Sequence, residues 1–184
     1  MVDDLYIQGS SGCLPDITLK LYKIHKEVLV KAPIEKVFDF FTKPENLLKL
    51  TPPSMKMQIL TPIPLQMSSG SIIDYAVSAS WLPLRWTAFI SEFSPPRRFV
   101  DTQLRGPYTY WHHTHSFQKD GEYTKIIDDV IYAMPLGYIG ILIHILLVKR
   151  QLKNIFMYRE KYLKEGVKWD VKAQRNTCRN YTND

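Results

Sequence analysis

Residues 110–166 read YWHHTHSFQKDGEYTKIIDDVIYAMPLGYIGILIHILLVKRQLKNIFMYREKYLKEG, and this stretch decides the fold. Two strand-like runs, Tyr110–Phe117 and Thr124–Ala133, flank the pair Asp120-Gly121, which is typical of a two-residue hairpin turn. After Pro135 the pattern becomes helical for nearly 30 residues, about 45 Å of helix at 1.5 Å per residue. One face of this helix is expected to carry Ile141, Ile145, Val148, Leu152, Ile155, Phe156, Arg159 and Leu163.

The residues before this stretch supply the rest of a sheet. Leu19–Val30 has a strand pattern and ends shortly before Pro33, a residue that suits the first turn of a helix. Pro44 and Pro52 divide the following segment into two short helices. Four more strand-like runs are separated by turn signals: Met57–Leu60, Ile72–Ser78, Trp86–Phe93 and Phe99–Leu104. This order predicts an α+β domain in which an antiparallel sheet of about seven strands curves around the long helix, leaving a pocket where sheet and helix diverge.

One domain accounts for the whole chain of 184 residues. We place it at residues 19–166. Residues 1–18, with the Gly-Ser-Ser-Gly run and Pro15, are predicted to form a flexible N-terminal extension, and residues 167–184 a flexible polar tail.

The composition excludes several classes of protein. The net charge of +6 comes from scattered basic residues, so we expect no nucleic-acid partner. Cys13 and Cys178, the only cysteines, lie near the two ends and indicate no disulfide framework. The N-terminus carries acidic residues where a signal peptide needs basic ones, so a cytoplasmic location is expected. The most apolar run, Leu136–Val148, is too short to span a bilayer, which takes about 20 residues.

Several motifs resemble the START-like superfamily, also called SRPBCC, and within it a group of bacterial ligand-binding proteins. The similarity covers about residues 19–165. The motifs are AP-x-E-x-VF-x-FF-x-x-PENL at 32–47, LTPP at 50–53, PP-x-x-FVD-x-Q-x-x-GPY at 95–108, W-x-H-x-H-x-F at 111–117, D-x-V-x-Y-x-x-P-x-G at 128–137, and VKR-x-L-x-x-IF-x-YR at 148–159. The resemblance implies a helix-grip fold and a ligand cavity.

The hairpin places polar groups on the face that should line this cavity. If Asp120 and Gly121 form the turn, His113 faces Asp128 across the strands, with Cβ atoms about 5 Å apart, and His115 is the diagonal neighbour. The same alternation puts Trp86, Ile90 and Glu92 on one face with Phe99, Asp101 and Gln103. The residues expected to contact a ligand are Trp86, Asp101, Gln103, Trp111, His113, His115, Phe117, Asp128, Tyr132 and Phe156.

Four uses of these polar groups are open from the sequence. They can satisfy one another in a buried hydrogen-bond network, or present donors and acceptors to the polar end of a ligand. They can also perform general acid/base catalysis, with His113, Asp128 and Tyr132 as candidate catalytic residues. A metal at His113 and His115 would need a third ligand, for which Asp128 is the nearby candidate. The first two uses are favoured, so we predict no metal site and no cofactor.

The leading prediction is therefore a non-enzymatic protein that binds a small hydrophobic ligand, either lipid-like or aromatic and polyketide-like. An enzyme of the cyclase, aromatase or dehydrase type is the alternative. A third hypothesis is an interaction module that contacts a membrane or a partner protein, through residues more apolar than one core stripe requires. These are Trp81, Leu82, Tyr138, Ile139, Ile143 and Leu147. The sequence gives no indication of the oligomeric state.

Overall fold

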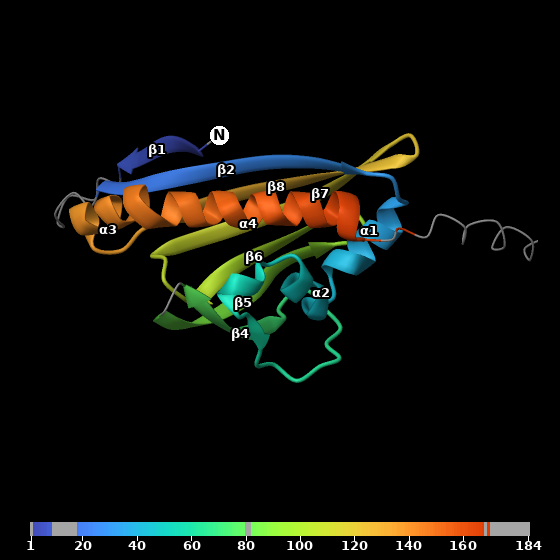
Figure 1. Cartoon of the computed structure of the whole chain (residues 1–184), viewed down its shortest axis with the longest axis horizontal. Helices are drawn as coiled ribbons and strands as arrows, with labels where there is room; N and C mark the ends of the chain where they lie inside the picture. The colour runs from blue at the N-terminus through green and yellow to red at the C-terminus, as the bar shows by residue number, and fades with distance from the viewer. Residues whose placement is uncertain (1, 9–17, 80–81, 168, 170–184) are drawn as a thin grey trace, which may run out of the picture.

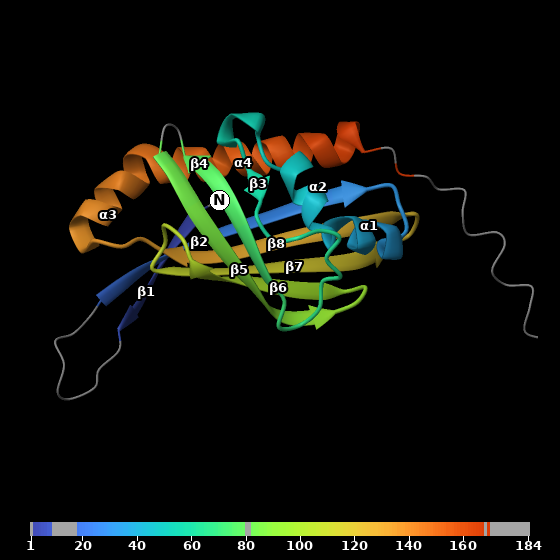
Figure 2. The ribbon, with the colours of Figure 1, turned by 90° about the horizontal axis from the view of Figure 1, so that it is seen from below.

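The computed structural model describes residues 2–8, 18–79, 82–167 and 169. A long C-terminal helix runs along one face of an antiparallel sheet, as Figures 1 and 2 show. The strands are β1 (Val2–Gln8), β2 (Thr18–Val30), β3 (Gln58–Ile59), β4 (Ile72–Ala79), β5 (Leu82–Ser94), β6 (Arg98–Arg105), β7 (Tyr110–Asp120) and β8 (Tyr123–Ala133), in the order β1-β2-β8-β7-β6-β5-β4-β3. The helical elements are α1 (Ile34–Phe41), α2 (Pro44–Lys49), η1 (Pro53–Met55), α3 (Gly137–Ile143), η2 (His144–Val148), α4 (Lys149–Lys161) and η3 (Tyr162–Gly166). The predicted α+β architecture is confirmed, with β2–β8 as the seven expected strands.

Parts of both predicted extensions contact the domain in the structure. Val2–Gln8 lies within the expected N-terminal extension but forms the edge strand β1, paired with β2 from Val2↔Ile24 to Gln8↔Thr18. This pairing satisfies backbone groups that the edge of β2 would otherwise leave open. At the other end, the Trp169 indole donates a hydrogen bond to the Leu163 carbonyl and packs against Phe40. Residues 9–17 and 170–184 lie outside the described residues.

The two short helices form where the prolines predict them. Pro33 precedes α1, and Pro44 is the first residue of α2. The apolar side of α1, formed by Val37, Phe38 and Phe41, is buried against the sheet. Figure 2 shows both helices near the end of the C-terminal helix, with α3 at the opposite end.

The C-terminal helix is continuous from Gly137 to Gly166, but the side chains at its beginning face other directions than predicted. The segment η2 is a π-helical turn, which inserts one residue relative to an α-helix. Residues before it are therefore rotated by about 100°, one residue's share of an α-helical turn. As a result His144 is buried, whereas Ile145, expected on the core face, is 61% exposed.

The β7–β8 hairpin has the predicted faces but a different register. Gly121 and Glu122 form the loop, because Asp120 already pairs with Tyr123. Gly121 has φ of +59° and Glu122 is not among the residues with positive φ, which fits a II′ turn with glycine at its first central position rather than a I′ turn. Our expectation that His113 faces Asp128 is therefore wrong: His115 is the direct partner of Asp128, and His113 pairs with Val130.

A bulge in β5 changes the face of another predicted residue. Ile90 pairs with Asp101, but Glu92 pairs with Val100, so one extra residue is accommodated between them. An extra residue reverses the alternation of side chains beyond it. Glu92 therefore leaves the face of Trp86 and Ile90 and bridges to Arg98 at 3.3 Å.

Two apolar clusters fill the space between sheet and helices. The first contains α1 and one end of the sheet, with Phe38, Phe41, Phe99 and Phe117 in ring contact. The second lies under α4 and contains Tyr22, Trp111, Val130, Tyr132, Leu152 and Phe156. Residues of both clusters line a common cavity.

Candidate functional site

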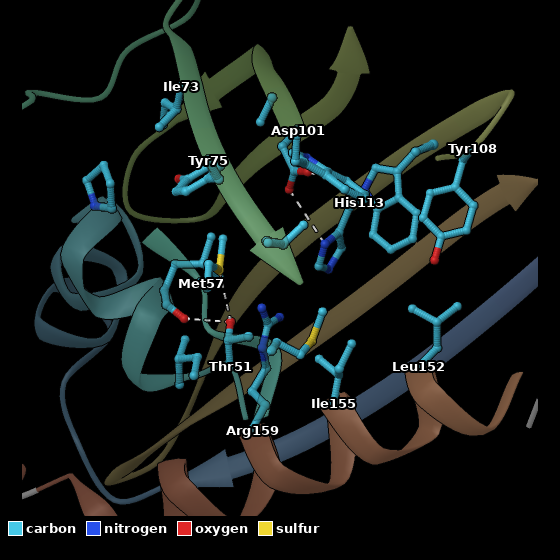
Figure 3. A pocket seen from close by; sticks show the side chains of 18 of the residues that line it. Thr51, Met57, Ile73, Tyr75, Asp101, Tyr108, His113, Leu152, Ile155 and Arg159 are labelled. Carbon is cyan, nitrogen blue, oxygen red and sulfur yellow. Dashed lines mark hydrogen bonds and ion pairs between the residues drawn. The ribbon is translucent and has the colours of Figure 1, made fainter. Parts of the chain in front are cut away.

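A cavity of about 260 Å³ lies between the C-terminal helix and the sheet. Figure 3 shows Leu152, Ile155 and Arg159 entering it from α4, and Ile73 and Tyr75 entering from β4. Segments around α2 and η1 close another side, with Thr51 and Met57 among the lining residues. Most of the wall is apolar, as is typical of small-molecule sites.

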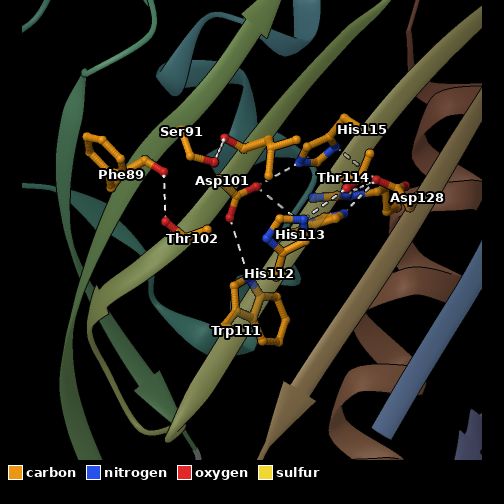
Figure 4. Close-up of polar contacts among 12 residues, drawn as sticks. Phe89, Ser91, Asp101, Thr102, Trp111, His112, His113, Thr114, His115 and Asp128 are labelled. Atoms are coloured by element: carbon orange, nitrogen blue, oxygen red, sulfur yellow. Dashed lines mark hydrogen bonds and ion pairs between the residues drawn. The ribbon is translucent and has the colours of Figure 1, made fainter. Parts of the chain in front are cut away.

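One wall of the cavity is charged, and it is formed by three adjacent strands. Asp101 on β6 pairs in register with His113 on β7, and His115 pairs with Asp128 on β8. The His115 Nε2 lies 2.9 Å from Asp101 Oδ2, and His113 Nε2 lies 2.9 Å from Asp128 Oδ1 (Figure 4). We call Asp101, His113, His115, Asp128 and Arg159 the polar cluster.

Arg159 completes the polar cluster from the opposite layer. Its Nη1 donates to Asp128 Oδ1 at 3.1 Å, and its guanidinium carbon lies 5.4 Å from the centre of the Phe156 ring. Both side chains of the Arg159–Asp128 pair are buried, and removing one partner of a buried ion pair leaves an uncompensated charge. This contact therefore ties α4 to the centre of the sheet.

The electrostatic state of the polar cluster follows from its geometry. Burial raises the pKa of Asp128, but the Arg159 charge, the hydrogen bond from His113 and the adjacent His115 outweigh it and hold that pKa well below its usual range. Burial also works against the charged form of Asp101, yet the adjacent histidines lower its pKa. Both carboxyl groups are therefore ionised.

The two histidines are shifted in opposite directions. Burial and the neighbouring His115 lower the pKa of His113 more than Asp101 and Asp128 raise it. For His115, burial is outweighed by the two flanking carboxylates, which raise its pKa. The geometry of the polar cluster therefore favours the neutral form of His113 and the protonated form of His115, whose positive charge adds to that of Arg159 beside the two carboxylates.

Aromatic side chains form the end of the cavity nearest η2. Trp86 and Trp111 meet edge to face with ring centres 5.0 Å apart, and Tyr108 lies 4.9 Å from Trp111. The Trp111 indole N–H points to Asp101 Oδ1 at 3.4 Å. These rings are positioned to pack against an aromatic or aliphatic ligand.

Six of the ten residues that we expected to contact a ligand line the cavity: Trp86, Asp101, Trp111, His113, His115 and Phe156. The other four lie elsewhere. The Gln103 amide brackets the backbone of Tyr108, donating to its carbonyl at 2.7 Å. Phe117 packs against α1, and Asp128 lies behind the histidines. The hydroxyl of Tyr132 meets His144 Nε2 at 2.9 Å, away from the cavity, so the structure does not place it as a proton donor to a ligand.

Arg159 and Tyr75 line the cavity although neither is among the ten residues that we expected to contact a ligand. A signal for Arg159 was present, because it lies on the predicted core face of the helix with Phe156 and Leu163, where a cation needs a buried partner. Tyr75 carried no such signal. Burial, with the charge of Asp101, raises its pKa, so it remains a neutral hydroxyl.

A metal ion could be held by Asp101, His113 and His115, each of which offers one donor atom within 4.8 Å of the others. The sequence suggested Asp128 as the third ligand. The strand register instead places Asp101 beside both histidines on the cavity side, with Asp128 behind them.

Comparisons with known proteins identify this fold. No protein-family model matches the sequence, and no curated protein sequence matches it significantly. Among solved structures, a START superfamily protein from Mycobacterium smegmatis is similar, with a TM-score of 0.58 at 16% identity over 77% of this chain and 96% of that one. An aromatase/cyclase, Zhui, from a Streptomyces species gives 0.55 at 17% identity over 79% and 98%. Norcoclaurine synthase from Thalictrum flavum gives 0.56 at 16% identity over 78% and 94%. The chain therefore has the helix-grip fold of the START-like superfamily, as the motifs predicted.

Proposed function

We propose that this chain, with its helix-grip fold, binds one small and mostly apolar molecule in the cavity beneath the C-terminal helix. The observation that carries the proposal is a mostly apolar cavity of about 260 Å³ whose charged lining groups all belong to the polar cluster. A mostly apolar cavity of this size suits a small aromatic compound or a short lipid-like chain.

The polar cluster gives the ligand an orientation. Arg159 is buried and lines the cavity, and its Nε has no hydrogen-bond partner among the described residues. An unsatisfied buried donor costs about 1–3 kcal/mol, which an acceptor atom on a ligand would recover. The ligand is therefore expected to carry an oxygen at one end, directed toward Arg159 and the histidines.

Native mass spectrometry followed by organic extraction tests this proposal. We expect the purified protein to carry one apolar compound per chain, or to take up an apolar fluorescent probe that the extracted compound displaces. A folded protein that retains no apolar compound and binds no apolar probe would contradict the proposal.

A second candidate function, proton transfer on a bound carbonyl compound, is favoured by the contact between His113 and Asp128. A neutral imidazole held at 2.9 Å by a carboxylate is the arrangement of a general base. The similar aromatase/cyclase and synthase are enzymes by name. If the extracted compound is converted by fresh protein, His113→Ala is expected to slow the conversion by about 100-fold or more. Unchanged conversion by a folded His113→Ala variant would exclude this function.

We infer that the protein takes its ligand from a membrane, because its surface carries a patch of exposed apolar side chains. Seven side chains around the start of the C-terminal helix are 56–92% exposed although all are large and apolar. We call this set the apolar helix surface: Leu136, Tyr138, Ile139, Leu142, Ile145, Leu146 and Leu147. His144, the one polar side chain between Leu136 and Val148, is buried on the sheet side. Of the other residues expected at this surface, Ile143 is 36% exposed, Trp81 lies outside the described residues and Leu82 begins β5.

Charge and length indicate how this surface would meet lipid. Lys149, Arg150 and Lys153 are exposed beside it, and no acidic residue occurs between Asp129 and Glu160. In a symmetric dimer the same cations would face each other, whereas anionic lipid neutralises them. Residues 136–148 cover about 20 Å as a helix, less than the ~30 Å bilayer core, so the helix would lie in the interface. Among the described residues, no helix is long and apolar enough to cross a membrane.

Vesicle flotation tests the membrane contact. We expect binding to phosphatidylcholine vesicles that contain phosphatidylglycerol and at least tenfold weaker binding after Tyr138→Ser with Leu142→Ser and Leu146→Ser, because these changes remove apolar area from the interface. Met157→Ser, at an apolar position further along the helix that is 54% exposed, is the control and should bind like the unmodified protein.

Equal binding by the triple variant, or no flotation of the unmodified protein, would contradict the membrane contact. A stable dimer that the triple variant converts to a monomer, without vesicle binding, would assign the surface to a second copy instead.

A further inference from the structure

We propose that Asp101, His113 and His115 form a binding site for a divalent transition-metal ion that opens into the cavity. The donor atoms would be Asp101 Oδ2, His113 Nδ1 and His115 Nε2. The three side chains come from neighbouring strands and share the cavity face, so no rearrangement of the backbone is needed to bring them together.

The spacing of the donor atoms matches a coordination sphere. Zinc binds nitrogen and oxygen at about 2.0–2.1 Å, so two ligands are about 2.9 Å apart at a right angle and about 3.4 Å apart at a tetrahedral angle. Asp101 Oδ2 lies 2.9 Å from His115 Nε2 and 3.5 Å from His113 Nδ1. All three donor atoms lie within 4.8 Å of one another. The two separations from Asp101 fit one ion directly, and the two imidazole nitrogens would need to lie within about 4.2 Å of each other in the bound state.

The nitrogens that would not bind the metal are held by a second carboxylate. His113 Nε2 donates to Asp128 Oδ1 at 2.9 Å, and His115 Nδ1 lies 2.9 Å from the same oxygen, although outside the angle of a hydrogen bond. Arg159 Nη1 fixes this oxygen from the helix side. A carboxylate on the far side of a ligating histidine is typical of metal sites, because it sets the tautomer and the ring orientation.

The ligand set indicates the class of metal and leaves room for a ligand. Two imidazoles and one carboxylate suit zinc, iron, cobalt or nickel better than calcium or magnesium, which prefer oxygen ligands. Three protein ligands with the remaining positions open to the cavity are typical of a reactive rather than a structural site. If the proposed function holds, those positions would take the oxygen at the polar end of the cavity ligand. The metal site itself does not depend on that ligand.

Metal binding can be measured on the whole chain after treatment with EDTA and organic extraction. We expect one Zn²⁺ per chain to remain after desalting, measured by elemental analysis, and Co²⁺ to give visible absorption bands that Zn²⁺ abolishes. His115→Ala and Asp101→Asn are expected to weaken Zn²⁺ binding by at least 100-fold. Asp128→Asn, behind the ligands, should weaken it by about 10–100-fold.

His112→Ala is the matched control, because His112 lies on the same strand but on the opposite face, where it stacks on Tyr110. It should bind Zn²⁺ like the unmodified chain. Substoichiometric zinc in the folded, unmodified protein would overturn the metal site, and so would full zinc retention by a variant lacking both His113 and His115. The Co²⁺ spectrum of the unmodified protein keeps the test valid if a variant does not fold. Uptake of an apolar probe by the EDTA-treated protein reports separately on the proposed function.

Discussion

Replacing Asp128 with alanine is expected to lower the free energy of unfolding by about 3–5 kcal/mol, because it leaves a buried cation without its counter-ion. Asp128 accepts hydrogen bonds from His113 and Arg159, and its side chain and that of Arg159 are 2% and 7% exposed. The loss corresponds to a fall in Tm of roughly 6–20 °C for a domain of this size. Urea unfolding followed by tryptophan fluorescence, with thermal melts, measures it.

The adjacent carboxylate is a matched control for this prediction. Asp129 points to the opposite face, where it meets His25 at 2.8 Å and its side chain is 34% exposed. Exposed ion pairs contribute about 0–1 kcal/mol, so Asp129→Ala should have a small effect. Asp128→Asn should fall between the two, since it keeps an acceptor for Arg159 but loses the charge. Equal stability of the Asp128→Ala and Asp129→Ala variants would show that the polar cluster does not hold the helix to the sheet.

Filling the cavity is expected to have the largest effect on ligand binding. Ala88 on β5 is buried and its side chain lines the cavity between Trp86 and Ile90. In the Ala88→Trp variant an indole would occupy much of the 260 Å³, so retention of an apolar compound should fall at least tenfold. Because the new side chain enters existing space, the change in unfolding free energy should remain within the ~1–3 kcal/mol typical of overpacking. Native mass spectrometry and probe titration measure the binding.

Leu104→Trp controls for the added aromatic ring. Leu104 on β6 is 59% exposed and lies outside the residues that line the cavity, so this variant should bind the probe like the unmodified protein. Undiminished binding by a folded Ala88→Trp variant would show that the ligand site is elsewhere. A result of that kind would also remove the argument that links the polar cluster to the ligand.

The sequence determined most of the elements, and the faces of β7 and β8, because those depend on local rules. Proline positions set the beginnings of α1 and α2, and the change of period after Pro135 marked the C-terminal helix. Side chains alternate with a period of two along a strand, so the two-residue error in the hairpin register left His113, His115 and Asp128 on the correct face. The motifs also predicted the helix-grip fold, because they occur along the chain in the order of its helices and strands.

Only the tertiary structure decided which groups meet. The turn at Gly121 and Glu122 made His115, and not His113, the cross-strand partner of Asp128, and the β5 bulge removed Glu92 from the cavity face. The π-helical turn η2 buried His144 and exposed Ile145, which removed a polar side chain from the apolar helix surface and added an apolar one. Each of these features shifts the chain by one or two residues, and the alternative local conformations are nearly equivalent in energy. They are settled by how strands and helix pack against each other, and that packing also brought Asp101 and Arg159 to the two histidines.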